Sequence, residues 1–188
     1  MDRSAVLIDG GYVDHVKTAF RASRVDFFRL SQELVMPYER FRTYYYHALP
    51  YVDAVQPDPD DVRRRGNAQR FLDGLSFLDR FEVRLGHLQR FATYDRQGSR
   101  VVRHRQKLVD VLFSVDLVEL AWSGRVAHVV IVAGDSDFVP AVRAAKAAGL
   151  VVRLVFADRG GCHVDRELRK ACDERIELTD AHLARWAS

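Results

Sequence analysis

The sequence predicts a three-layer αβα fold with a mostly parallel central sheet, and two observations support this prediction. Short apolar runs rich in branched side chains recur along the chain, and segments with apolar residues at helical spacing separate these runs. Strands that alternate with helices form βαβ units, which build parallel sheets covered by helices on both faces. A chain of 188 residues is long enough for one hydrophobic core, so we expect a single domain over residues 1–188.

The first half of the chain shows this alternation three times. Continuous apolar or aromatic runs predict strands over residues 5–8, 42–49 and 81–88. Apolar residues at helical spacing predict helices over residues 13–20 and 58–78, and Gly10 and Gly11 are expected to end the first strand. Asp58 and Pro59 are typical of a helix cap and a first helical turn, and the proline-rich segment over 50–61 predicts a loop.

The second half continues the pattern after a basic segment. Residues 91–107 are polar and basic and predict an irregular excursion or a hairpin, so we expect a basic excursion at about 89–107. Residues 108–122 carry apolar side chains on two stripes, which predicts a helix buried on most of its surface. Further elements are expected as strands over 126–133 and 150–156 and helices over 138–148, 165–173 and 180–186.

Composition and charge narrow the class of protein. The chain is 48% hydrophobic and 29% charged with a net charge of +3, which is typical of a globular protein and compatible with a nucleic-acid partner. Its two cysteines are too few for a disulfide framework or a four-cysteine zinc site. The apolar runs are too short for a signal peptide or a membrane span, so we expect a cytoplasmic protein with no membrane partner.

Acidic residues follow two of the expected strands at the point where each strand ends. Asp9 comes directly after the first strand, and Asp135 and Asp137 follow the strand over 126–133. Asp110 interrupts the apolar stripes near the start of the long helix, where a buried carboxylate would need a positive partner. Because ligands bind beyond the carboxyl ends of parallel strands, near the point where strand order reverses, we expect these four carboxylates to converge.

Converging carboxylates need compensation, because like charges in one pocket repel each other. Either their pKa values rise or divalent cations bind between them. A ligand set made only of oxygen atoms favours Mg²⁺ or Mn²⁺ over zinc, and such ions suit phosphoryl chemistry. The alternative is that each aspartate only caps a helix or closes a turn.

Asp116 lies on the same expected helix as Asp110, six residues further along the chain. Six steps of about 100° place it about 120° round the helix from Asp110. Geometry alone therefore predicts a solvated group, or a group that supports the site without binding the ion.

Three segments together resemble the NYN domain, the LabA-like branch of the PIN-like nucleases: VLIDGGYV, KLVDVLFSVDLVELA and VVIVAGDSDFVPAVRAAKAAGLVV. Their order and spacing match that family from residue 4 to about residue 178. The resemblance implies a PIN-like α/β fold and a metal-dependent ribonuclease site that uses Mg²⁺ or Mn²⁺.

The resemblance also implies roles for individual residues. By position, the catalytic and metal-binding acids of the family fall on Asp9, Asp110, Asp135 and Asp137. Asp116 matches a frequent family aspartate and Lys107 matches the family's lysine, so both are implied to support the site. Many members of the family carry Asn three residues after the first Asp, whereas this chain carries Tyr12.

A basic segment is the expected RNA-binding surface. Residues 84–107 carry seven arginines and lysines against one acid, and Phe91 and Tyr94 lie among them. Cationic side chains neutralise phosphates, and aromatic rings stack on bases. The residues expected to contact RNA are Arg90, Arg96, Arg100, Arg103, Arg105 and Lys107. The alternative is that these arginines only solvate a loop. Arg63, Arg64 and Arg65 form a second basic cluster, which is either a further RNA contact or only the outer face of a helix.

These patterns favour a metal-dependent endoribonuclease that hydrolyses phosphodiester bonds of single-stranded or structured RNA. Two alternatives stay open: a non-catalytic RNA- or protein-binding adaptor on the same fold, and a magnesium-dependent phosphatase built on Asp-x-Asp. A phosphatase of the haloacid-dehalogenase type would carry Asp-x-Asp after its first strand, where this chain has Asp9 followed by two glycines. The sequence is compatible with a homodimer and does not decide the oligomeric state.

Overall fold

A seven-stranded sheet forms the centre of the protein in the computed structural model. The structure describes residues 2–94 and 100–187, and for residues 87–94 and 100–107 it describes the backbone. The strand order is β4 (Arg100–Lys107), β3 (Phe81–Tyr94), β2 (Glu39–Ala48), β1 (Arg3–Asp9), β5 (His128–Val132), β6 (Val151–Phe156) and β7 (Glu174–Glu177). Within the described strands six run parallel, while β4 pairs antiparallel with β3. The expected αβα fold with a mostly parallel sheet is therefore confirmed.

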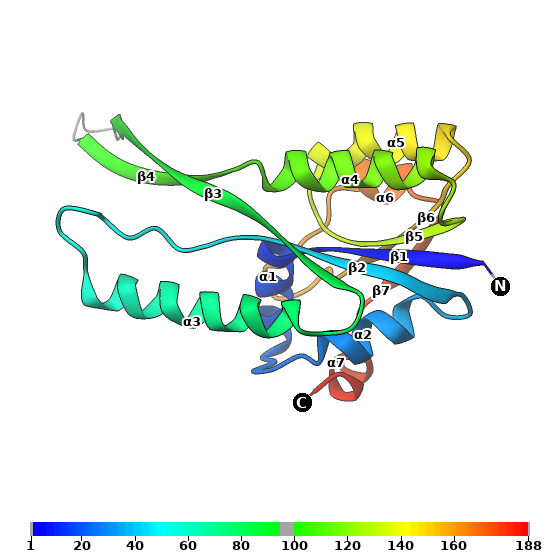
Figure 1. Cartoon of the computed structure of the whole chain (residues 1–188), viewed down its shortest axis with the longest axis horizontal. Helices are drawn as coiled ribbons and strands as arrows, with labels where there is room; N and C mark the ends of the chain where they lie inside the picture. The colour runs from blue at the N-terminus through cyan, green and yellow to red at the C-terminus, as the bar shows by residue number, and fades with distance from the viewer. Residues whose placement is uncertain (1, 95–99, 188) are drawn as a thin grey trace.

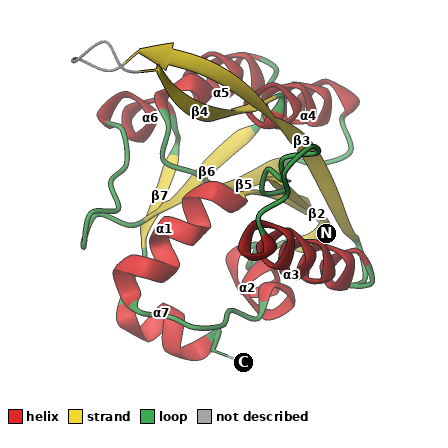
Figure 2. Ribbon diagram, turned by 90° about the vertical axis from the view of Figure 1, so that its left-hand side faces the viewer, coloured by secondary structure: helices red, strands yellow, loops and turns green. Residues whose placement is uncertain are grey.

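Helices cover both faces of this sheet, as Figure 1 and Figure 2 show. One face carries α4 (Val109–Ser123), α5 (Val139–Ala147) and α6 (Arg166–Ala171). The other face carries α1 (Gly10–Phe20), α2 (Phe27–Leu34), α3 (Pro59–Ser76) and α7 (Asp180–Arg185). A short 3₁₀ turn, η1 (Ser136–Phe138), leads from β5 into α5.

The strand β1 occupies the middle of the sheet, and its sequence explains this position. Four consecutive apolar residues, Ala5 to Ile8, are fully buried, because helices cover both faces of the strand. From β1 the chain builds the sheet outward in one direction through β2 and β3, and later in the other direction through β5, β6 and β7. The strand order thus reverses between β1 and β5, where parallel sheets bind their ligands.

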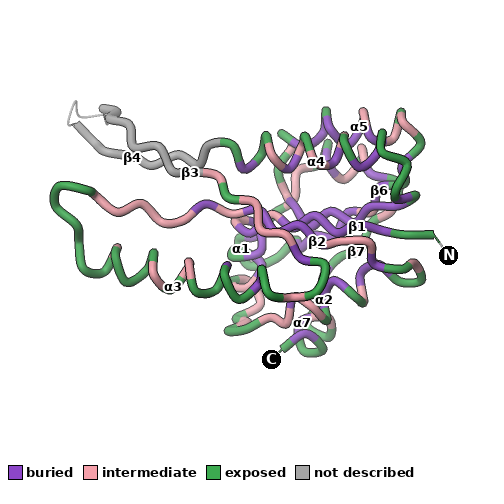
Figure 3. Tube along the Cα trace, viewed as in Figure 1, coloured by how far each residue is buried: buried purple, intermediate pink, exposed green. Residues whose placement is uncertain are grey.

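The buried residues concentrate in the central strands and on the helix sides that face them, as Figure 3 shows. In α4, Phe113 and Leu117 are fully buried against the sheet. The other stripe of the same helix points outward, with Val111 56% and Trp122 74% exposed. The expectation of a helix buried on most of its surface is wrong, because the described residues cover α4 on one side.

Two short elements, α2 and β7, were not predicted from the periodicity of the sequence. The helix α2 is eight residues long and is capped by Asp26, whose carboxylate accepts a hydrogen bond of 2.9 Å from the N–H of Arg29. The strand β7 has four residues, and its side chains alternate between half-buried and exposed. Each element is too short to repeat an apolar pattern often enough for the pattern to stand out.

The first helix begins earlier than expected, because Gly10 belongs to it. A Cβ atom on Gly10 would lie 2.8 Å from both a ring carbon of Tyr45 and the carbonyl oxygen of Tyr46. The absence of a side chain lets the start of α1 pack directly against β2. Gly10 therefore marks a close approach between elements as well as the end of a strand.

The segment expected as an irregular excursion or a hairpin forms an antiparallel strand pair. Its register runs from His87 opposite Lys107 to Tyr94 opposite Arg100. Figure 1 shows the pair extending past the sheet on the side where β1 ends, above the beginning of α3. Among the helices of the described residues, none is long and apolar enough to span a lipid bilayer.

Candidate functional site

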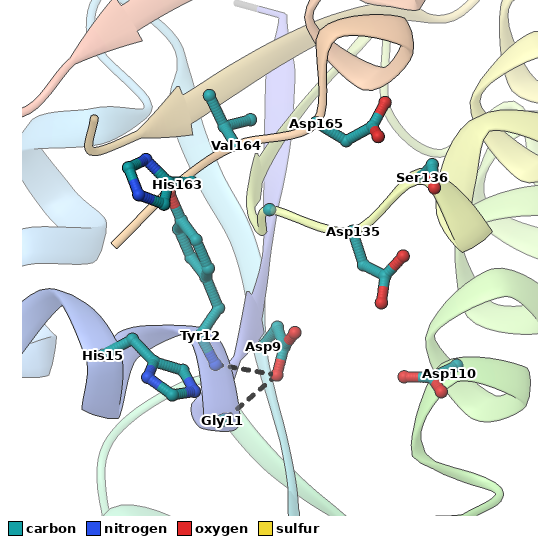
Figure 4. Close-up of a pocket in the computed structure, with 11 residues that line it drawn as sticks. Asp9, Gly11, Tyr12, His15, Asp110, Asp135, Ser136, His163, Val164 and Asp165 are labelled. Carbon is teal, nitrogen blue, oxygen red and sulfur yellow. Dashed lines mark hydrogen bonds between the residues drawn. The ribbon is translucent and has the colours of Figure 1, made fainter. Parts of the chain in front are cut away.

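A pocket of about 670 Å³ opens at the carboxyl ends of β1 and β5, where the strand order reverses. Its acidic lining residues come from four parts of the chain: Asp9 from the end of β1, Asp110 from α4, Asp135 from the turn after β5 and Asp165 from the turn before α6. Figure 4 shows the side chains of Asp9, Asp110 and Asp135 pointing toward one another across this pocket. Three of the four predicted carboxylates therefore share one pocket.

Asp9 is held at the floor of the pocket by the first turn of α1. Its Oδ1 atom accepts hydrogen bonds from the N–H groups of Gly11 at 2.9 Å and Tyr12 at 3.2 Å. Both bonds use Oδ1, so Oδ2 remains for a second partner. The pKa of Asp9 is raised from 3.8 to about 6, chiefly by burial and in part by the negative charges of Asp110 and Asp135, while the two N–H groups act against this rise.

Asp135 and Asp110 reach the pocket from the turn after β5 and from the first turn of α4. The Oδ1 atom of Asp135 accepts a 3.0 Å hydrogen bond from the N–H of Asp137 and so caps η1. Asp110 lies in the first turn of α4 and is exposed, which corrects the expectation of a buried carboxylate on this helix. The residue before the helix is Leu108, whose left-handed backbone with φ of 74° is unusual for a leucine.

The aspartates that line the acidic pocket also cap helices, which the sequence analysis gave as the alternative to a metal site. Asp9 caps α1 and Asp135 caps η1, while Asp165 caps α6 by accepting a 2.7 Å hydrogen bond from the N–H of Glu167. Asp110 occupies the first turn of a fourth helix. Backbone N–H groups at helix beginnings are unpaired donors, so they offset part of the repulsion between these carboxylates.

Two predicted acids lie outside the lining of this pocket. Asp137 is exposed on η1, where its neighbour Ser136 takes the place on the pocket wall. Asp116 lines a different cavity of about 240 Å³, as expected for a residue on another side of α4. Its Oδ2 atom accepts hydrogen bonds from the hydroxyl of Tyr46 at 2.8 Å and from Nε of Arg84 at 3.1 Å. Asp116 is therefore a paired, largely buried group, and its assignment to a supporting role at the metal site stays a prediction.

Tyr12, at the position where the resemblance implies Asn, ties the pocket to the residue that follows β6. Its hydroxyl donates to the carbonyl of Ala157 at 3.1 Å and accepts from the N–H of the same residue at 2.9 Å. The ring packs so closely on Gly134 that a Cβ there would lie 2.3 Å from it. The phenol is thus fully occupied in holding the pocket wall, so it does not replace an Asn side chain as a metal ligand.

Three residues of the lining carry chemistry that the sequence patterns did not single out: His15, His163 and Asp165. His163 is an exposed side chain at the rim, and its Nδ1 atom lies 3.0 Å from Oδ1 of Asp158. His163 and Asp165 come from the segment after β6, where no apolar periodicity fixes their direction, whereas His15 lies in the middle of α1 and outside its apolar stripe. The one available signal was the sequence Asp-Arg-Glu-Leu at 165–168, which is typical of a helix start.

The six residues predicted to contact RNA all fall where side chains are not described. Arg96 lies outside the described residues, and so do the side chains of Arg90, Arg100, Arg103, Arg105 and Lys107. The backbone alone places these residues on β3 and β4, except Arg96. Their contacts with RNA stay a prediction, as does the role of Lys107 near the pocket.

Fold and pocket together define a class of protein: a parallel α/β sheet with a polar, carboxylate-rich pocket at its switch point. The chain belongs to the NYN domain family, which matches residues 3–179 and so nearly the whole length. This membership indicates a PIN-like nuclease fold and confirms the resemblance seen in the sequence. None of the curated proteins is similar enough to count as a match.

A solved structure supports the fold independently. The chain is similar to a protein of unknown function from Vibrio parahaemolyticus, with a TM-score of 0.61 and 20% sequence identity. The similarity covers 95% of this chain and 94% of the other chain. At this identity the similarity shows the shared fold alone.

Proposed function

We propose that the chain is a metal-dependent endoribonuclease that hydrolyses RNA phosphodiester bonds at the acidic pocket. The observation that carries the proposal is the meeting of Asp9, Asp110 and Asp135 in one pocket at the switch point of the sheet, in a member of the NYN domain family. Asp137 is not among the residues that line the pocket, where η1 contributes Ser136 instead. Its role as a fourth ligand therefore stays a prediction.

The donor set suits Mg²⁺ or Mn²⁺. Its candidate ligands are carboxylates, and hard divalent cations prefer oxygen. In the described part of the chain, no group of three or more His, Cys, Asp or Glu side chains is arranged to hold a metal ion. Mg²⁺ usually keeps several waters and uses one or two carboxylates, so pairs among Asp9, Asp110 and Asp135 can serve with waters completing the shell.

The pocket residues suit hydrolysis in line with the scissile bond. The reaction forms a bond between a water oxygen and phosphorus, breaks the bond to the leaving ribose oxygen and moves a proton from the water to that oxygen. A divalent cation, when bound, lowers the pKa of water and neutralises phosphate charge. Asp9, with a pKa of about 6, is mostly ionised at neutral pH and offers Oδ2 to a cation or a proton. His163 lines the same pocket, with its Nδ1 3.0 Å from Oδ1 of Asp158, and its imidazole can hydrogen-bond to the RNA.

The test is cleavage of single-stranded RNA in Mg²⁺ or Mn²⁺ by the purified chain and by Asp135→Asn. Asparagine can still accept the capping bond from the N–H of Asp137, so the fold should persist while one ligand charge is lost. We expect the rate to fall about 100-fold or more. Asp60→Asn, an exposed acid on α3, is the matched control and should cleave like the parent. Equal cleavage by Asp135→Asn and the parent would show that the assignment is wrong.

The same assay separates the two alternatives. Release of inorganic phosphate from small phosphate esters, with RNA left intact, would identify a phosphatase. RNA binding without cleavage and without phosphate release would identify a non-catalytic adaptor.

A further inference from the structure

A second groove, of about 560 Å³, adjoins the acidic pocket on the side of β6. Its lining residues are Asp158, Val164, Arg166, Arg169, Lys170 and Arg175. Val164 lines both the groove and the acidic pocket, so the two are neighbours that meet at this residue. The lining residues of the groove come from the loop after β6, from the helix α6 and from Arg175 in β7, so the groove begins beside the carboxyl end of β6 and follows α6.

The charges in this groove have the opposite sign from those in the pocket. Four of its six lining residues are cationic and one is acidic. Two of the cations are held in place by the protein itself. The guanidinium of Arg169 stacks 4.6 Å from the ring centre of Phe156 and lies 3.7 Å from Asp158, while that of Arg175 donates to the carbonyls of Arg169 and Cys172. Guanidinium groups fixed before binding lose little conformational entropy when a ligand arrives.

Arg166 is the cation best placed to contact a ligand. It is exposed at the first position of α6, directly after Asp165 of the acidic pocket. To the described residues it makes neither an ion pair nor a hydrogen bond, whereas Lys170 is paired with Glu167 at 2.8 Å. Its guanidinium is therefore available at the junction between the two depressions.

We propose that this groove, named here the α6 groove, binds the phosphate backbone of the RNA strand next to the scissile bond. The inference rests on the proposed function, and it adds where the substrate is held. Carboxylates repel phosphates, so the acidic pocket by itself cannot hold an RNA strand without neighbouring cations. The α6 groove supplies these cations, beginning with Arg166, which directly follows Asp165 of the acidic pocket. Guanidinium groups bind phosphate through paired hydrogen bonds.

The side chains that line the groove also indicate whether its binding depends on the base sequence of the RNA. The nearest aromatic ring, Phe156, is 2% exposed and is covered by Arg169, so the lining offers no ring for stacking on a base. Contacts to phosphates carry no sequence information. The groove should therefore position the strand independently of its bases.

The test is binding of fluorescent single-stranded RNA in EDTA, which separates binding from cleavage, at several salt concentrations. Arg166→Glu should weaken binding about tenfold and reduce the slope of log affinity against log salt by about one. Oligouridine and oligoadenosine should lose affinity by the same factor. Arg166→Lys keeps the charge and should bind nearly as the parent does. Arg24→Glu, an exposed arginine in the loop after α1, is the matched control and should change neither quantity.

The outcomes distinguish a failure of the groove from a failure of the proposed function. If Arg166→Glu binds RNA as tightly as Arg24→Glu, the α6 groove is not the binding surface, even where the parent cleaves RNA. If the parent binds no RNA in EDTA, the groove is equally refuted. If the parent leaves RNA intact in Mg²⁺ and Mn²⁺ while Arg166→Glu weakens binding, the groove stands and the proposed hydrolysis falls.

Discussion

At the scale of single residues, Asp9 serves two roles with conflicting requirements. As the cap of α1 it accepts hydrogen bonds from two backbone N–H groups, and an uncharged side chain could also accept these bonds. As a pocket carboxylate it is partly buried beside Asp110 and Asp135, and its pKa is raised to about 6. In the second role, Asp9 lowers the free energy of unfolding of the metal-free protein at every pH at which its carboxylate is ionised.

We therefore expect Asp9→Asn to stabilise the metal-free protein at pH 8 but not near pH 4. The folded-state pKa lies above the unfolded value, so this group favours folding at low pH, and that contribution is lost as the pH rises from about 4 to about 6. Asparagine keeps the cap and removes the charge, which should gain about 2–3 kcal/mol at pH 8. Thermal or urea unfolding in EDTA at both pH values measures the difference.

Asp26→Asn provides the control for this comparison, since Asp26 caps α2 on the surface and outside the pocket. It should change stability little at either pH. A gain from Asp9→Asn that is equal at pH 4 and pH 8, or absent at pH 8, would contradict the raised pKa.

Gly134 offers a second residue-scale prediction, because two side-chain atoms and a backbone atom crowd it. A Cβ there would lie 2.3 Å from a ring carbon of Tyr12 and 2.9 Å from the carbonyl of His163. Tyr12 cannot yield easily, since Ala157 holds its hydroxyl. Gly134→Ala should destabilise the protein by about 1–3 kcal/mol or more. Gly74→Ala, in α3 with nothing within 4 Å, should instead stabilise it by about 0.5–1 kcal/mol in the same unfolding assay. Equal effects of both substitutions would argue against this crowding.

The sequence predicts some pocket residues better than others, and the reason is local. Asp9 and Asp135 follow strands whose apolar runs fix the strand ends, so their positions could be inferred. The direction of Asp137 depends on the 3₁₀ turn η1, which turns Ser136 toward the pocket. Asp165 enters from a loop after β6, and no periodic pattern indicates where a loop leads.

At the scale of elements, α4 separates a buried stripe from an exposed one. Leu117 is fully buried, while Val115, two positions away, is 47% exposed. Leu117→Ala should reduce the free energy of unfolding by about 2–5 kcal/mol, since it leaves a cavity in the core. Val115→Ala should change it by less than about 0.5 kcal/mol, as measured by urea unfolding. A large loss from Val115→Ala would mean that this stripe is covered in solution.

The elements themselves were predictable where their patterns are long. The central strands and the helices α3, α4 and α5 carry apolar runs or repeats that indicate their type from sequence alone. The two stripes of α4 look alike in sequence, and only the number of neighbouring layers decides which one is buried. The order of strands, which brings Asp9 beside Asp135, follows from the crossover geometry of parallel sheets and not from any single segment.

At the scale of the whole molecule, metal binding should be visible as stability. A cation that binds only the folded state adds about 2.7 kcal/mol at 100 times its dissociation constant, which corresponds to a Tm increase of about 5–10 °C for a chain of this size. We expect millimolar Mn²⁺ to raise the Tm of the parent and of Asp26→Asn, and to raise that of Asp135→Asn much less. No shift in the parent, or an equal shift in Asp135→Asn, would speak against a metal centre formed by these carboxylates.

The link between Tyr12 and Ala157 has a consequence for the position of the cut. It clamps the helix turn next to Asp9 to the segment that continues into Asp158 and the α6 groove. When a strand is anchored in the groove, the span between groove and pocket decides which nucleotide linkage is hydrolysed. Tyr12→Phe keeps the ring against Gly134 and releases Ala157. End-labelled RNA should then yield products that differ by single nucleotides where the parent yields one, with a similar total rate, whereas an unchanged product pattern would show that this hydroxyl does not set the cleavage register.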